Sequence, residues 1–450
     1  LSDPDLYDKV FPGTKLPIAV HCMYQGMFAI ITPALISGAF AERVKFGAYC
    51  LFITLWATLV YDPLAHWVWA VGADGKAAGW LGKLGALDFA GGTVVHISAG
   101  FAGLAAILLL RKRFGYPERA MHPNSMVLTL TGAGLLWFGW FGFNGGSALA
   151  ASPLAAFALT ASQVAAAAAG LSWVAVEWMH RGKPTGLGLA SGIVAGLVAV
   201  TPASGFVSPL GALVIGITAG AVCYAAVCLK PSFKYDDSLD AFGVHGIGGF
   251  LGAVLTGVFA SAVLYKAGSG SDIPSDYLAQ ASVNRFGQIG VQLLAALVAA
   301  AYSFVATGVL VKVIDATVGF CLPAKTEGLG LDRGVHGEVG FDLDPVEEAA
   351  AEVHYHEPKA ANVPPNGHRR FTVVVEGANN GDLMHTWSSL CQVGGKPAPN
   401  EFKTVYPYVT TVQGNRFRFR GGDPVMLREN LEKLFRDQLD GSAIRTHVES

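Results

Sequence analysis

Two histidines stand inside apolar stretches of the sequence, where an ionisable side chain is costly and therefore marks a candidate functional site. His96 belongs to residues 88–110 (DFAGGTVVHISAGFAGLAAILLL), and His245 belongs to residues 240–255 (DAFGVHGIGGFLGAVL). Both stretches begin with an aspartate and continue beyond the histidine with glycine and small apolar residues. A neutral imidazole has one donor and one acceptor nitrogen, so such a pair could hydrogen-bond a substrate or handle a proton. We expect the two histidines to share one site.

The composition indicates a membrane protein. Of 450 residues, 52% are hydrophobic and only 14% are charged, whereas globular domains average about 25% charged residues. The net charge of -2 and the lack of a long basic tract argue against a nucleic-acid partner. The six cysteines show neither CxxC nor zinc spacing, so we interpret them as buried apolar residues and expect no metal site and no cofactor.

Nine apolar segments must position the histidines. Each can cross a hydrocarbon core of about 30 Å as a helix, although one of them is short and rich in glycine. We therefore expect an all-α polytopic membrane fold, in which the many glycines let the helices approach closely. The segments are 16–40, 46–71, 89–110, 126–149, 153–178, 187–200 (the short one), 210–229, 242–264 and 286–320.

Lysine and arginine in the short loops predict the orientation of the spans. Ten lie on one side, namely Arg43, Lys45, Arg111, Lys112, Arg113, Arg119, Arg181, Lys183, Lys230 and Lys234, against Lys76, Lys83, Lys266 and Arg285 on the other. The first side is expected to be cytoplasmic, together with the long C-terminal tail. The two histidine stretches then cross in opposite directions, as in an inverted repeat with its site near the midplane.

The composition changes after the last apolar segment. Residues 341–369 are polar and acidic and look like a linker, and residues 370–450 follow a globular pattern. Strands are expected at 370–376, 404–412, 416–420 and 444–449, and helices at 381–392 and 423–439, the latter with Asp423 as N-cap. The order βαββαβ predicts a ferredoxin-like α+β domain.

Seven motifs resemble the ammonium transporter (Amt/Mep/Rh) family, and its Amt branch in particular. They are YQGMFAIITPALISGAFAERVKF, AHWVW, GALDFAGGTVVHISAG, WFGWFGFNGGSA, ASGIVAGLVAVTPASG, FGVHGIGGFLGAVLTGVFA and EGLGLDRGVHGE. The resemblance implies an inverted-repeat bundle of eleven spans in a homotrimer with one pore per subunit. Residues 1–340 correspond to about nine of these spans, and we expect the first two to be missing because the sequence is a fragment.

The resemblance also implies roles for individual residues. Trp69 and Ser147, with Phe28 beside them, resemble the outer ammonium recruitment site, although Trp69 taken singly is more readily interpreted as a tryptophan of the membrane interface. Phe28 with Phe143 resembles the phenyl gate, although each phenylalanine taken singly is more readily interpreted as a packing residue. His96 and His245 resemble the twin-histidine pair of the pore. Asp88 resembles the acidic residue near the recruitment site, where we expect it to cap the Gly91 or Gly92 amides. Asp240 is expected to cap its own helix.

The resemblance favours a transporter in the cell membrane that conducts ammonium or ammonia and is not an enzyme. The alternative is an ammonium sensor that signals through residues 370–450. The EGLGLDRGVHGE tail resembles the segment through which PII signalling proteins regulate the family. A haem oxidoreductase with both histidines as ligands is a third and weaker interpretation. The run His354–Glu357 (HYHE) could bind a metal ion, but its interpretation as part of a solvated linker is favoured.

Overall fold

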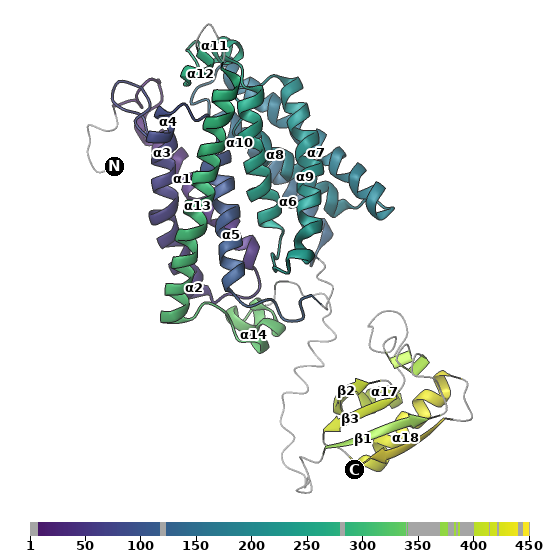
Figure 1. Ribbon diagram of the computed structural model, residues 1–450. Helices are drawn as coiled ribbons and strands as arrows, with labels where there is room; N and C mark the ends of the chain where they lie inside the picture. Colours follow the sequence, from purple (N-terminus) through teal and green to yellow (C-terminus); the bar gives the residue numbers. More distant parts are fainter. Residues whose placement is uncertain are drawn as a thin grey trace. The chain divides into compact units, whose positions relative to one another are not determined.

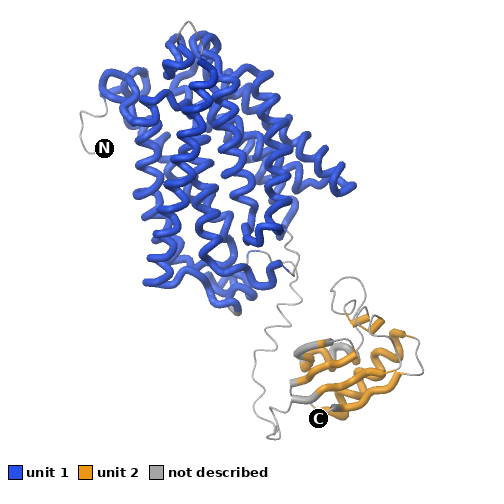
Figure 2. The backbone as a smooth tube through the Cα atoms, viewed as in Figure 1, with its two compact units in different colours: residues 1–340 blue, residues 341–450 orange. Residues whose placement is uncertain are grey.

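The computed structural model describes residues 8–117, 123–279, 284–338, 340, 370–376, 382–383, 386–387, 400–413, 415–420, 423–439 and 444–449. The chain divides into two compact units, residues 1–340 and 341–450 (Figure 2). Each unit has a hydrophobic core of its own. The expected linker, 341–369, and the HYHE run within it lie outside the described residues.

The first unit is a bundle of long apolar helices that stand side by side (Figure 1). Within the described residues, eight helical spans are long and apolar enough to cross a membrane, and the shorter α8 (Gly186–Val200) is the short ninth segment of the prediction. The polytopic helical fold is therefore confirmed. The eight spans are α1 (Ile18–Phe40), α2 with η2 and α3 (Phe46–Trp56, Ala57–Tyr61, Asp62–Trp69), η3 with α5 (Gly92–Ile97, Ser98–Leu109), α6 (Met126–Gly146), α7 (Pro153–Arg181), α9 (Pro209–Phe233), η4 with α10 (Phe242–Gly246, Ile247–Phe259) and α13 (Arg285–Val318).

Shorter helices connect the spans or follow the last one. They are α4 (Trp80–Lys83), α11 (Ala262–Ser269), α12 (Asp276–Ala279), α14 (Ala324–Leu329) and η5 (Asp332–His336). Several predicted ends differ from the observed ones by a few residues, and the backbone explains two of these differences. The helix of His96 begins at Gly92 and not near Asp88, because Gly91 has a φ of +114° that glycine alone adopts readily. The span predicted to reach residue 264 ends at Phe259, because Ala260 leaves the helical region (ψ 138°) and Ser261 then caps α11.

Small residues allow the close helix packing that the glycine content predicts. A Cβ atom on Gly216 of α9 would lie 2.5 Å from the carbonyl oxygen of Ala165 in α7, and one on Gly196 of α8 would lie 2.4 Å from the same oxygen. Side chains at these two positions would push the three helices apart. In a membrane, where lipid is as apolar as leucine, such close contact is what holds helices together.

The second unit contains a four-stranded antiparallel sheet in the order β2-β3-β1-β4, which is the ferredoxin-like order. The strands are β1 (Arg370–Glu376), β2 (Val409–Gln413), β3 (Arg416–Arg420) and β4 (Arg445–Glu449). Helix α18 (Pro424–Gln438) begins as predicted, with the Asp423 carboxylate accepting from the Val425 amide at 3.0 Å. Its leucines and Phe435 are buried against Phe417 and Phe419 of β3.

One strand of this unit was predicted too long. The strand expected at 404–412 starts at Val409, because α17 (Asn400–Val405) and a 3-10 turn, η6 (Tyr406–Tyr408), precede it. Pro407 in that turn lacks the amide that a ladder needs. Most of the helix expected at 381–392 lies outside the described residues, of which 382–383 and 386–387 are helical.

Candidate functional site: two histidines between antiparallel helices

His96 and His245 meet inside the first unit. Their Nδ1 atoms lie 3.3 Å apart, and their rings are stacked with centroids 5.3 Å apart. One Nδ1 must donate and the other accept, so the two neutral imidazoles have opposite tautomers in this arrangement. The Nε2 atom of His96 is buried and has no hydrogen-bond partner among the described residues. The pair therefore leaves a buried ring nitrogen that no described residue bonds.

Glycines let the two histidine helices cross in contact. A Cβ atom on Gly100, four residues after His96, would lie 2.2 Å from the Gly246 nitrogen. A Cβ atom on Gly249, four residues after His245, would lie 2.9 Å from the His96 Cβ atom. Each helix thus has a glycine at the place where the histidine segment of the other helix passes. This reciprocal contact is the local signature of the expected inverted repeat.

Asp88 caps the helix of His96 more completely than predicted. Its Oδ1 accepts from the amides of Gly91 (2.8 Å) and Gly92 (2.7 Å), as expected, and its Oδ2 accepts from Thr93 (2.9 Å) and Val94 (3.0 Å). Burial raises the pKa of Asp88, and these four hydrogen bonds oppose the rise because they require the ionised carboxylate. The first turn of the helix therefore has all its free amides satisfied by one side chain.

The predicted cap of the second histidine helix is wrong. Asp237, not Asp240, caps η4, because its two oxygens accept from the amides of Ala241 (3.0 Å) and Phe242 (2.8 Å). Asp240 instead accepts from the Lys230 ammonium at 2.5 Å. Burial raises the pKa of Asp237 to about 6. The sequence did contain a signal for this assignment, since Asp237 precedes His245 by the same eight residues that separate Asp88 from His96.

A row of aromatic rings leads from Trp69 to the histidines. Phe28 lies 5.7 Å from Trp69 and 4.7 Å from Phe143 between ring centroids, and Phe143 lies 6.0 Å from His96. The structure therefore brings the predicted recruitment and gate residues together with the histidines. Sequence reasoning missed Trp140, whose ring stacks on His96 at 5.4 Å, one helical turn before Phe143.

Ser147 is bonded, near the rings of Phe28 and Phe143, by a residue that the sequence analysis did not single out. The hydroxyl of Tyr24 lies 3.0 Å from Ser147 Oγ and 2.8 Å from the carbonyl oxygen of Phe143. Ser147 itself donates to the Phe143 carbonyl at 2.8 Å. The Tyr24 ring also stands edge-on to Phe28 at 5.0 Å. Two hydroxyl oxygens and several aromatic faces thus surround the same place.

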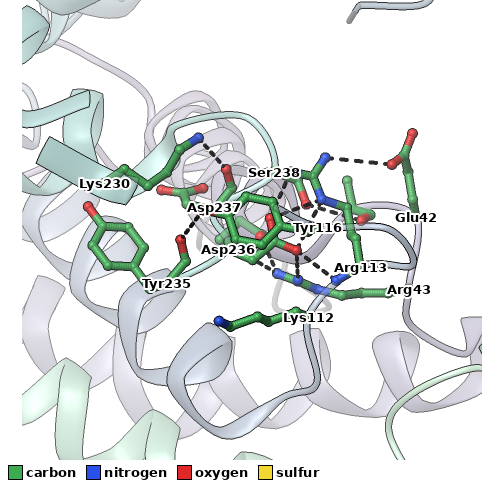
Figure 3. Close-up of polar contacts among 12 residues, drawn as sticks. Glu42, Arg43, Lys112, Arg113, Tyr116, Lys230, Tyr235, Asp236, Asp237 and Ser238 are labelled. Atoms are coloured by element: carbon green, nitrogen blue, oxygen red, sulfur yellow. Dashed lines mark hydrogen bonds and ion pairs between the residues drawn. The ribbon is translucent and has the colours of Figure 1, made fainter. Parts of the chain in front are cut away.

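Two of the arginines used to orient the loops are buried and paired (Figure 3). Asp236 accepts from Arg43 Nη1 at 2.5 Å and from Arg113 Nη2 at 2.7 Å, and its carbonyl oxygen also accepts from Arg43. Burial alone would raise the pKa of Asp236, but hydrogen bonds from Arg113 and the charge of Arg43 outweigh it and lower the pKa. This cluster joins the ends of α1 and α5 to the loop before η4. Its existence could not be inferred from loop charge alone.

The segment after α13 contacts the same end of the bundle. Glu327, the first residue of EGLGLD, accepts from the amide of Phe114 at 2.6 Å and forms an ion pair with Arg111. The amide of Leu322 donates to the Arg43 carbonyl at 2.9 Å. The segment from Leu322 to Glu327, where the tail motif begins, therefore contacts the loops that follow α1 and α5. Within the described parts of the chain, no three His, Cys, Asp or Glu side chains gather in a way that could hold a metal ion.

Comparison with known proteins gives one consistent result. The Ammonium Transporter Family model matches residues 5–341. The chain is 46% identical over 327 residues to the ammonium transporter of Bacillus subtilis (72% of this chain, 76% of that protein) and 46% identical over 330 residues to Amt1 of Archaeoglobus fulgidus (73% and 79%).

Two solved structures add to this result. The chain is similar to the crystal structure of Saccharomyces cerevisiae Mep2, with a TM-score of 0.63 and 39% identity over 69% of this chain and 68% of that chain. It is also similar to a structure titled Sensor Amt Protein, with a TM-score of 0.61 and 30% identity over 68% of this chain and 74% of that chain.

Proposed function

Because this chain belongs to the ammonium transporter family, we propose that it recruits ammonium beside Trp69, removes a proton and conducts ammonia past His96 and His245. The family consists of transporters and not of enzymes, so the activity of the chain is ammonium transport across a membrane. The proposal concerns the route and the residues. Its main support is the 3.3 Å separation of the two Nδ1 atoms in the interior of the bundle.

Recruitment rests on Trp69, Phe28 and Ser147, to which we add Tyr24. A small cation that loses part of its water shell is attracted to aromatic faces, by about 0.5–2 kcal/mol for each favourable contact. Hydroxyl oxygens replace part of the lost water. The 5.7 Å between the Trp69 and Phe28 rings, together with the hydroxyls of Ser147 and Tyr24, supports a site of this kind.

We expect ammonium to lose its proton because of the environment beyond the recruitment site. Phe28 and Phe143 form the proposed gate, and a bare ammonium ion beyond them would lack compensation for its lost hydration. The proton that ammonium loses is taken up by the acceptor nitrogen of the neutral imidazole pair, and the remaining ammonia is neutral and has both a donor and an acceptor function. The stacked histidines could then exchange hydrogen bonds with it, because His96 Nε2 has no partner among the described residues. Asp88 acts mainly as a structural cap with a long-range attraction for cations.

The wider setting is part of the same proposal. The excess of basic loop residues supports a cytoplasmic position for the Arg43 and Arg113 end and for the C-terminus. We propose a multi-pass protein of the inner or plasma membrane that assembles as a homotrimer with one pore per subunit. A PII-type signalling protein would bind at the cytoplasmic tail, where Glu327 contacts the loop after α5.

Transport by this route can be tested in proteoliposomes. Vesicles containing the chain should take up methylammonium, and ammonium should compete with it. Replacing His96 and His245 together by leucine should abolish uptake while the protein still elutes as a folded oligomer. Uptake by the double variant at the rate of the unchanged chain would exclude the proposed route.

A second candidate function is ammonium sensing. It is favoured by the separate ferredoxin-like unit and by the 30% identity to the structure titled Sensor Amt Protein. Deletion of residues 345–450 distinguishes the two functions. Sensing predicts unchanged transport and a lost response of nitrogen-regulated genes, whereas a purely transporting chain would keep that response.

A further inference from the structure

The last span contains two buried glutamines that the route described above does not use. Gln288 and Gln292 lie four residues apart on α13, so they share one face of the helix. Both are completely buried. An unsatisfied amide is costly inside a bundle, and a glutamine there needs partners for two donors and an acceptor. Several of their partners are backbone groups of the segment that leads to Asp88, and Gln288 also accepts from the hydroxyl of Ser275.

Gln292 binds both backbone groups of Leu87. Its Oε1 accepts from the Leu87 amide at 2.7 Å, and its Nε2 donates to the Leu87 carbonyl at 2.8 Å. Gln288 extends the contact, because its Nε2 donates to the carbonyl of Gly85 at 2.9 Å. Buried backbone groups outside regular secondary structure need partners of this kind. The two glutamines supply those partners for the stretch immediately before Asp88.

Asp88, the residue after Leu87, connects this segment to the proposed transport route. The carbonyl of Asp88 accepts from the Trp69 indole nitrogen at 2.8 Å, and its carboxylate caps the helix of His96. Gln292 Nε2 also donates to the carbonyl of Ala253, eight residues after His245 in α10, at 3.1 Å. Gln292 therefore bonds Leu87, the residue next to the one that Trp69 contacts. It also bonds α10, the helix that follows His245.

We propose that Gln292 is a positioning residue that sets the place of Trp69 and the start of the His96 helix relative to α10. The inference rests on the proposed function insofar as it concerns transport. Without the Gln292 amide, Leu87 would have an unpaired N–H and C=O, and the segment would have to move to find other partners. The movement would displace the indole of Trp69, so ammonium recruitment would weaken before conduction does.

Two substitutions separate positioning from packing. Gln292→Met keeps the length of the side chain and suits an apolar bundle but removes every hydrogen bond. Gln292→Glu keeps an acceptor and, in the neutral form that burial favours, one donor. Packing alone predicts that methionine is tolerated better than glutamate, and positioning predicts the reverse. Ser303→Ala is the matched control, because Ser303 is equally buried on α13 and its Oγ has no partner among the described residues.

Methylammonium uptake and hydrogen exchange give the readouts. In proteoliposomes we expect Gln292→Met to raise the apparent KM by about tenfold with a smaller change in Vmax, Gln292→Glu to lie closer to the unchanged chain, and Ser303→Ala to match it. Peptides covering residues 85–95 should exchange faster in Gln292→Met only. If Gln292→Met does not fold, Gln292→Asn replaces it, since the shorter amide cannot span both groups of Leu87.

If Gln292→Met leaves both the apparent KM and the hydrogen exchange of residues 85–95 unchanged, Gln292 has no positioning role. A larger rise of the apparent KM in Gln292→Glu than in Gln292→Met would also contradict the proposal. If the unchanged chain itself does not transport, the proposed function fails. The exchange of residues 85–95 then decides the positioning role by itself.

Discussion

Asp88 and Asp237 cap the two helical segments that contain His96 and His245, and each lies eight residues before its histidine. Both segments, η3 and η4, are π-helical at the capped end. The two caps lie at opposite ends of the bundle, since Asp237 neighbours the Arg43 and Arg113 cluster that closes the other end of α5. The histidines meet between them. The caps are therefore what fixes the depth at which each imidazole stands.

Asp88→Asn should weaken both stability and transport. An asparagine has one acceptor oxygen in place of two, so two of the four amides lose their partner, at a cost of about 2–4 kcal/mol in the free energy of unfolding. Uptake should fall because the His96 helix no longer starts at a fixed place. The measurement is thermal unfolding in detergent together with methylammonium uptake. Asp240→Asn, which alters only the contact with Lys230, should change stability by less than about 1 kcal/mol.

Asp237 should make stability depend on pH between about 4 and 6. Its pKa in the folded chain, about 6, lies above the ordinary value of 3.8 because of burial. The folded state therefore binds the proton more tightly, and the resulting stabilisation is fully present below pH 3.8 and is lost as the pH rises through 6. The full effect amounts to about 3 kcal/mol. Asp237→Asn should remove this part of the slope in thermal unfolding, and an identical slope in both proteins would contradict the assignment.

Substitution of one histidine should stop conduction without unfolding the bundle. His245→Asn keeps a hydrogen-bonding side chain but cannot exchange a proton, so we expect uptake to fall by at least about tenfold. His180→Asn provides the control, because His180 bonds the Tyr224 hydroxyl outside the row of rings. Equal uptake by the two variants would mean that the His96 and His245 pair has only a packing role.

Tyr24→Phe should weaken ammonium binding. It removes the hydroxyl that lies 3.0 Å from Ser147 Oγ and leaves the ring against Phe28 in place. Loss of one oxygen near the cation corresponds to about 1 kcal/mol, or about a fivefold higher apparent KM. Tyr302→Phe is matched to it, since Tyr302 also donates to a backbone carbonyl but lies elsewhere. A rise of the same size in both variants would argue against a recruitment role for Tyr24.

Asp236→Ala should be among the most destabilising single changes in the first unit. It leaves two buried guanidinium groups, Arg43 and Arg113, without their carboxylate, which costs about 3–5 kcal/mol. Asp272→Ala removes an exposed partner of Lys266 and should cost about 0–1 kcal/mol. Thermal unfolding in detergent compares the two, and similar melting temperatures would show that the cluster contributes little.

Local sequence determined much of this molecule. Hydropathy predicted the spans because burial in lipid requires a continuous apolar run, and the local sequence predicted β1 and β3 at their observed bounds. The positions of His96 and His245 in oppositely directed spans were enough to predict that they meet. The cap at Asp423 was also predictable from the sequence, because capping involves residues that are only a few positions apart.

Only the tertiary structure decided which polar groups pair over long separations. Asp237 and Asp240 both precede the helix of His245, and the eight-residue spacing to the histidine is the only feature of the sequence that favours Asp237 as the cap. In the fold, the Asp240 carboxylate is bonded to Lys230, and the Asp237 carboxylate accepts from the Ala241 amide. Arg43 reaches Asp236 across 193 residues, and Gln292 reaches Leu87 across 205. The sequence around a side chain does not predict a partner that lies so far away along the chain. Such partners exist because burial leaves each polar group to be satisfied by whichever neighbour the fold brings within hydrogen-bond distance.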